Sequence, residues 1–172
     1  DAAAAYAHGR RAFELAEGAG ERLAAAVYGL NLGLACFEQG RLGEALTRVR
    51  SGAEQIAELG NDALLAHATL NLAHIHQAFG DDTAAAELLP LAERSALRAG
   101  QSNVATHADL TWAGIELRRG KRQASLARLD SALERISACG QEARPLLLAR
   151  AALGLAEAGL VARAHEVLSA HE

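Results

Sequence analysis

The chain has 172 residues, of which 51% are hydrophobic, 22% charged and only 3% aromatic, and its formal net charge is −4. This length and apolar content suffice for a buried core, whereas interspersed charges of both signs describe a solvated surface that is not built to bind nucleic acid. No apolar run approaches the ~20 residues of a membrane span, and no secretory signal is present. Cys36 and Cys139 form no disulfide framework or C-x-x-C metal pattern. We therefore expect a cytoplasmic protein with two buried thiols and no membrane contact.

Glycine recurs at a fixed interval, and each occurrence ends a helical apolar pattern. A glycine just past a helix end supplies the left-handed residue that closes the helix at no steric cost. The terminators fall every twenty residues at Gly20, Gly40, Gly60, Gly80, Gly100, Gly120 and Gly140, and Gly159 comes one residue early. This spacing predicts nine helices, at about residues 2–17, 21–39, 41–58, 62–79, 82–98, 102–119, 122–138, 143–158 and 160–170.

Small side chains recur at fixed distances from these glycines, which indicates where paired helices approach each other closely. One row lies seven residues before a glycine and another five residues after it; they are Gly33, Ala73 and Ala113, and Ala45, Ala85 and Ser125. The pattern predicts an all-α solenoid of antiparallel helix pairs. We expect a single domain over residues 1–172, with a half repeat at 1–19 and repeats at 20–59, 60–99, 100–139 and 140–172.

The repeated sequence L-N-L-G-L-A-C-F-E-Q-G-R-L-G-E-A-L at 30–46 and its counterpart at 70–89, L-N-L-A-H-I-H-Q-A-F-G-D-D-T-A-A-A-E-L-L, resemble tetratricopeptide (TPR) repeats. The likeness covers nearly the whole chain. Two features depart from it: Cys36, His76 and Glu116 replace the usual aromatic residue, and the period is forty rather than about 34 residues. The longer period is similar to the repeats of kinesin light chains and of MalT-like bacterial regulators. The resemblance implies a right-handed superhelix that binds a protein or peptide segment.

Two other functions fit the same pattern. The chain would be the effector-sensing region of a MalT-like bacterial transcription regulator if its groove took a small molecule, or a structural array if it served only self-association. Arginine greatly outnumbers lysine, a bias typical of high-GC bacterial genes, and a chain that lacks methionine and begins inside a helical pattern is expected to be a fragment of a longer protein. The segment 143–158 is apolar nearly all round, so we also expect a homo-oligomer through the terminal repeats.

The first helix of each pair lines the concave face in such arrays. In TPR proteins that bind extended peptides, an asparagine directly before the Leu-Gly or Leu-Ala pair commonly holds the ligand backbone, and an amide offers both a donor and an acceptor for that purpose. Turning the small residues inward between helices exposes a face with spacing i, i+3 or i+4, i+7. The candidate ligand-binding residues on this face are Asn31, His67, Asn71, His74, His107, Thr111 and Arg118.

Histidines beside Asp109 and Glu116 invite a metal or acid–base interpretation, but helix geometry opposes it. His74 and His76 point to different faces, and His67 and His74 stand about 10 Å apart along the helix axis, too far for one metal to reach both. No nucleophile with an adjacent base and no phosphate-binding glycine loop is present. We expect no catalytic residue, no metal ligand and no cofactor.

A group of basic residues surrounds the turn near Gly120. The cations complement the negative end of a helix dipole, or they form a patch for an anion or an acidic peptide; the sequence leaves both interpretations open. The group consists of Arg118, Arg119, Lys121 and Arg122.

Overall fold

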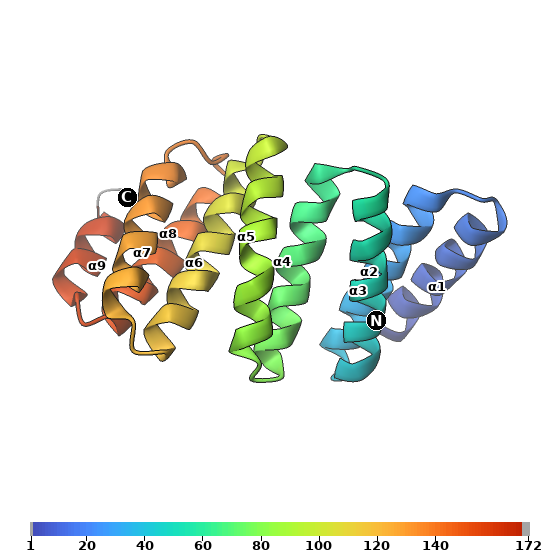
Figure 1. Cartoon of the computed structure of the whole chain (residues 1–172), viewed down its shortest axis with the longest axis horizontal. Helices are drawn as coiled ribbons and strands as arrows, with labels where there is room; N and C mark the ends of the chain where they lie inside the picture. The colour runs from blue at the N-terminus through green and yellow to red at the C-terminus, as the bar shows by residue number, and fades with distance from the viewer. Residues whose placement is uncertain (1, 170–172) are drawn as a thin grey trace. The chain divides into compact units, whose positions relative to one another are not determined.

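A computed structural model gives the fold of residues 2–169, with side chains described from Tyr6 onward. Every regular element in that range is an α-helix, and the all-α helical-repeat architecture is confirmed (Figure 1). Within residues 2–169 the nine helices lie within two residues of their predicted bounds. They are α1 (Ala2–Gly18), α2 (Arg22–Glu38), α3 (Leu42–Glu58), α4 (Asp62–Ala78), α5 (Asp82–Arg98), α6 (Ser102–Arg118), α7 (Arg122–Ile136), α8 (Arg144–Glu157) and α9 (Val161–Ser169).

The periodic glycines close the helices as the sequence predicts. After α4, Gly80 adopts a φ of 76°. Its N–H donates to the carbonyl of Gln77 at 2.9 Å, and the N–H of Asp81 donates to the carbonyl of His76, also at 2.9 Å. These bonds satisfy helix-terminal carbonyls. The Asp81 carboxylate then accepts from the N–H of Ala84 at 2.9 Å and so caps the start of α5.

Gly140 is the exception, and the prediction that it closes a helix as a left-handed residue is wrong. It does not adopt a positive φ, because α7 already ends at Ile136 and an irregular segment leads to α8. The guanidinium of Arg144 donates to the carbonyls of Ser137 at 3.1 Å and Cys139 at 3.2 Å. These side-chain bonds satisfy carbonyl groups near the end of α7, where backbone N–H groups do so at the other turns. Pro145 follows in the first turn of α8 and restricts the backbone before it. This connection therefore has its own geometry.

The chain divides into two compact units, one up to Ser95 and one from Ala96 onward. The boundary falls inside α5, which continues without interruption through Pro90. The expectation of a single domain over residues 1–172 stays a prediction.

In unit 1 the core lies among α2, α3 and α4, and small residues set the distance between helices. A Cβ added to Gly33 would lie 2.6 Å from Cγ2 of Val49, and one added to Gly52 would lie 3.0 Å from the carbonyl oxygen of Ala26. Such short distances show that the backbone of each helix, α2 and α3, lies against atoms of the other. The rows of small residues predict this close approach. Cys36 is fully buried in this core and forms no disulfide.

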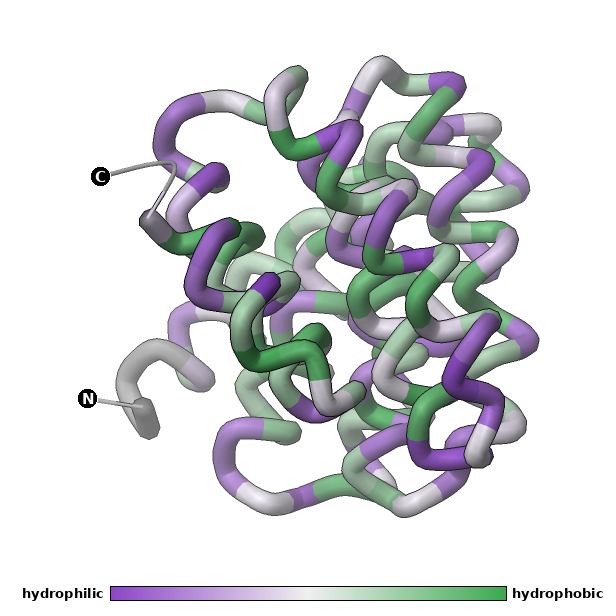
Figure 2. The backbone as a smooth tube through the Cα atoms, turned by 90° about the vertical axis from the view of Figure 1, so that its left-hand side faces the viewer, coloured by the Kyte–Doolittle hydropathy of each residue, from purple (hydrophilic) through white to green (hydrophobic). Residues whose placement is uncertain are grey.

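In unit 2 the core joins residues of α6 to α9. Leu129 and Leu155 are buried, and a Cβ on Gly154 would approach Cδ2 of Leu129 to 2.8 Å. Cys139 is 4% exposed, also without a disulfide, so both thiols are buried as expected. Hydrophobic and hydrophilic residues alternate with the turns of the helices (Figure 2), which is the pattern of helices that bury one face.

Candidate functional site

The candidate ligand-binding residues of the concave face, which we call the inner face, lie in unit 1 on α2 and α4, two helices that contact each other. Asn31 and His67 are exposed, while Asn71 and His74 are half-buried. The three residues of α4 share one side of the helix because their spacing follows its turn. Neither asparagine amide forms a hydrogen bond with another residue in the described part of the chain. Both amides therefore keep their full capacity to donate and accept.

The inner-face residues predicted for unit 2 are more varied. Arg118 is exposed and His107 is half-buried. Thr111 is only 3% exposed, and its hydroxyl donates to the carbonyl of His107 at 2.8 Å. A threonine can satisfy its hydroxyl on its own helix in this way and so become buried. It offers a ligand little surface, although the helical spacing places it in the same row as Asn31 and Asn71.

A cavity of about 520 Å³ lies between α1 and α3 above α2, and the sequence analysis did not identify it. We call it the α1–α3 cavity. Its floor is made of small residues of α2, and its walls carry polar side chains. The floor includes Ala25, Ala26 and Gly29; α1 contributes Phe13 and Glu17; and α3 contributes Gly43, Glu44, Thr47, Arg48, Ser51, Gly52 and Gln55.

This cavity faces away from the predicted inner face. At 100° per residue, the direction of Gly29 along α2 differs from that of Asn31 by about 200°. The two sites therefore use opposite sides of one helix. A ligand bound on one side does not touch the residues of the other.

Two repeated positions on the cavity floor carry smaller residues in the first repeat than in the second. Gly29 of α2 corresponds to Thr69 of α4 and to Asp109 of α6, each forty residues apart. Thr69 is 2% exposed and its hydroxyl donates to the carbonyl of Leu65 at 2.7 Å. Leu65 of the second repeat stands at the position that Ala25 has in the first. The first repeat thus has an alanine and a glycine where the second has a leucine and a threonine.

The charges on the cavity wall are partly neutralised. Glu44 accepts from Arg48 Nε at 3.0 Å and from the Tyr6 hydroxyl at 3.3 Å, and lies 3.4 Å from Arg41. The bond from Arg48, reinforced by the charge of Arg41, holds the pKa of Glu44 below its usual range. Glu17 differs, because it forms no ion pair or hydrogen bond with another residue within 6–169.

Arg41 interacts with three side chains of the first unit, those of Tyr6, Cys36 and Glu44. Its guanidinium lies 4.5 Å from the centre of the Tyr6 ring and donates to the sulfur of Cys36 at 2.8 Å. The hydrogen bond to Cys36, followed by the interaction with Tyr6, raises the pKa of Arg41 further above its already high value. Arg41 remains a permanent cation that positions the neighbouring carboxylate of Glu44.

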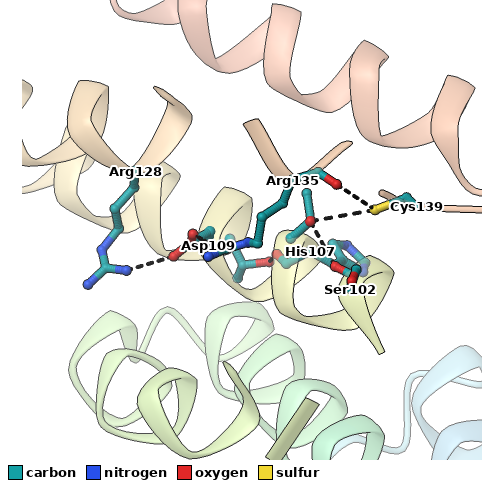
Figure 3. Close-up of polar contacts among 8 residues, drawn as sticks. Ser102, His107, Asp109, Arg128, Arg135 and Cys139 are labelled. Carbon is teal, nitrogen blue, oxygen red and sulfur yellow. Dashed lines mark hydrogen bonds and ion pairs between the residues drawn. The ribbon is translucent and has the colours of Figure 1, made fainter. Parts of the chain in front are cut away.

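In unit 2 the corresponding position holds a buried carboxylate (Figure 3). Asp109 is 1% exposed and forms ion pairs with two arginines of α7, Arg128 at 2.7 Å and Arg135. The guanidinium of Arg128 also lies 3.2 Å from the ring centre of Trp112. Both carboxylate oxygens are engaged, so this cluster is arranged for packing rather than acid–base chemistry. The sequence signal was available, since Arg128 and Arg135 stand seven residues apart on one face of α7.

Basic residues around Gly120 form ion pairs and a hydrogen bond with other residues of the chain. Lys121 Nζ lies 3.3 Å and Arg119 3.9 Å from the carboxylate of Glu116. Arg122 donates to the carbonyl of Ala158 at 2.9 Å and so satisfies the end of α8. These contacts favour the helix-terminus interpretation over a free anion patch.

No group of three or more histidine, cysteine, aspartate or glutamate side chains is arranged to hold a metal ion within residues 2–169. None of the helices in that range is both long and apolar enough to cross a membrane.

The backbone arrangement is similar to that of solved TPR-like repeats. Two crystal structures of nearly identical TPR-like repeats from a kinesin light chain candidate of Podosopora anserina, one of them a point variant, match with TM-scores of 0.67 and 0.65 at 16% and 17% identity, over 85% of this chain and 72% of theirs. BtubC (BKLC) from P. vanneervenii matches with a TM-score of 0.65 at 16% identity, over 95% of this chain and 84% of that one. No protein-family model and no curated protein matches the sequence. The likeness establishes a TPR-like helical-repeat fold.

Proposed function

We propose that this TPR-like helical-repeat chain is a non-catalytic scaffold that binds a protein or peptide segment on the inner face of its helix pairs. The contacts in unit 1 would come from α2 and α4, and those in unit 2 from α6. Because Thr111 is buried, the proposal does not depend on it. The contributing residues are Asn31, His67, Asn71 and His74 in unit 1, and His107 and Arg118 in unit 2.

The two unbonded amides are the observation that supports this proposal. Two other amide side chains of unit 1 are used within the chain: Asn61 accepts from the N–H of Leu64 at 3.0 Å, and Gln55 donates to Ser51 at 3.2 Å. Asn31 and Asn71, one repeat apart, have no such partner in the described chain. An extended peptide presents N–H and C=O groups that can pair with a side-chain amide.

The proposal can be tested by selecting binders from a peptide library with the purified chain and measuring the affinity of the best peptide by calorimetry. Replacing both Asn31 and Asn71 with alanine should weaken binding by about 1–3 kcal/mol, because ligand amides lose their partners. Gln123→Ala is the matched control, since Gln123 is an exposed amide on α7, outside the predicted face.

Unchanged affinity in the double variant would exclude the asparagine contacts. Stabilisation by a small metabolite instead of a peptide would favour the effector-sensing region of a MalT-like bacterial transcription regulator.

Self-association through the C-terminal repeat is a second proposal, supported by exposed leucines. Leu146 is 63% and Leu153 59% exposed on α8, and Val161 is 55% exposed on α9. Leu153 and Val161 border a hollow of about 310 Å³ between these two helices. A contiguous apolar surface of this kind drives association. A sedimentation mass that stays monomeric at high protein concentration would contradict this proposal.

A further inference from the structure

We propose that the α1–α3 cavity is a second binding site, which takes a peptide segment with an aliphatic side chain next to a lysine or arginine. It lies on the face of α2 opposite Asn31 and does not depend on the inner-face proposal. The cavity's volume of about 520 Å³ falls within the roughly 300–1,000 Å³ typical of ligand pockets.

The floor of the cavity fits an aliphatic side chain. Ala25, Ala26 and Gly29 present methyl groups and backbone, and the ring of Phe13 lies against Gly29, 3.3 Å from where a Cβ would stand. Burying an aliphatic side chain there removes apolar surface from water on both partners. Thr69 and Leu65, both buried, stand at the corresponding positions of the second repeat, so the repeat accommodates larger side chains at these positions.

The walls of the cavity are rich in hydrogen-bond acceptors. The hydroxyl of Thr47 already donates to the carbonyl of Gly43 at 3.0 Å, so its oxygen is left to accept. The amide of Gln55 donates to Ser51, which leaves the Gln55 carbonyl oxygen to accept. Glu17 contributes a carboxylate without a partner among residues 6–169. A ligand that brings N–H donors satisfies these groups.

The charge of the site selects a cation. Two carboxylates, Glu17 and Glu44, and one guanidinium, Arg48, line the cavity. Arg48 is engaged by Glu44, so Glu17 is left as the uncompensated charge. Glu17 also lies in the last turn of α1, which carries no basic residue. The negative end of the helix dipole favours a cation at that place, and none is supplied from within the described chain.

The third repeat shows that long basic side chains fit beside this helix position. Around Asp109, which corresponds to Gly29, the guanidinium groups of Arg128 and Arg135 extend from α7 toward α6 (Figure 3). In the first repeat Gln55 stands where the third has Arg135. The first repeat keeps Arg48 where the third has Arg128 but lacks the second arginine, and a partner's lysine or arginine would fill the space of that second side chain.

The test uses the whole chain and two capped dipeptides, N-acetyl-Leu-Arg-amide and N-acetyl-Leu-Glu-amide, followed by nuclear magnetic resonance. We expect the Leu-Arg probe to shift the backbone signals of Gly29, Thr47 and Ser51 saturably at millimolar concentration, and the Leu-Glu probe to bind several-fold more weakly. Glu17→Gln should weaken the Leu-Arg probe by about threefold to tenfold. The matched control is Glu54→Gln, an exposed carboxylate of α3 outside the cavity, which should keep full affinity.

Ser51→Leu gives the cavity the residue that the second repeat has at Leu91, and it should abolish binding of the Leu-Arg probe. Because Ser51 is exposed, this variant is expected to fold. The peptide selected for the inner face should bind Ser51→Leu normally, which separates the two proposals. Equal affinity of the two probes, equal effects of Glu17→Gln and Glu54→Gln, or no saturable shift at the three cavity residues would overturn the assignment.

Discussion

The first and third repeats place opposite kinds of residue at the same helix position. In α2 it is Gly29, beside a cavity of about 520 Å³. In α6 it is Asp109, 1% exposed and held by Arg128 and Arg135. The backbones follow the same repeat, yet this position borders a cavity in the first repeat and carries an internal ion pair in the third. If the α1–α3 cavity binds as we propose, the array keeps one framework while separate repeats serve binding and stability.

The largest effect is expected from removing the carboxylate of the third repeat. Asp109→Ala leaves the guanidinium groups of Arg128 and Arg135 without their shared partner in a largely buried place. Loss of one member of a buried ion pair costs about 3–5 kcal/mol. We expect the lower part of that range, since 27% and 23% of the two arginine side chains remain exposed to water. Chemical denaturation of the two proteins measures the difference.

Asp130→Ala is the control for that experiment. Asp130 pairs with Arg163 at 2.6 Å, but the two side chains are 48% and 42% exposed. An exposed pair contributes about 0–1 kcal/mol. If both aspartate variants lost the same stability, the burial of Asp109 would not be the reason for its importance.

A smaller effect should separate two glycines one turn apart on α2. A Cβ at Gly33 would lie 2.6 Å from Cγ2 and 3.1 Å from the backbone nitrogen of Val49, so Gly33→Ala should destabilise by about 1–3 kcal/mol. At Gly29 the contact is the Phe13 ring at 3.3 Å, which can move. Gly29→Ala should be neutral or up to about 1 kcal/mol stabilising, since alanine favours the helix. Thermal melts that ranked the two variants the other way would show that the cavity floor at Gly29 is as tightly packed as the contact between Gly33 and Val49.

Most of the fold could be predicted from the sequence because one local rule repeats. Each periodic glycine is a helix terminator whose effect depends only on its own backbone, so helix bounds followed to within two residues. The rule failed at Gly140, where Arg144 reaches back to the carbonyls of Ser137 and Cys139. That contact depends on a long side chain from the next helix, and no spacing pattern reveals it.

The proposed functional surfaces were harder to predict. Helical spacing could place Asn31 and Asn71 on one face, but it placed Thr111 there too, although that hydroxyl turns back to its own helix and the residue is buried. No pattern in the sequence predicted the α1–α3 cavity. A cavity is missing volume, and its existence depends on small residues from three helices at once. Comparing Gly29 with Thr69 and Asp109 across the repeats would have been the available signal.

The smallest expected effect concerns acid stability at the cavity wall. Arg48 and Arg41 hold the pKa of Glu44 below its usual range in the folded chain. A carboxylate with a depressed folded pKa stabilises the protein at pH values above its unfolded pKa, about 4.3, and this contribution disappears as the pH falls through the folded pKa. Glu44→Gln should therefore lower the denaturation midpoint at neutral pH, and its difference from the wild-type chain should shrink toward zero below about pH 4. A difference for Glu44→Gln that stayed constant down to low pH would mean that its side chain acts through packing, and that the cavity wall is not held in place by its ion pairs.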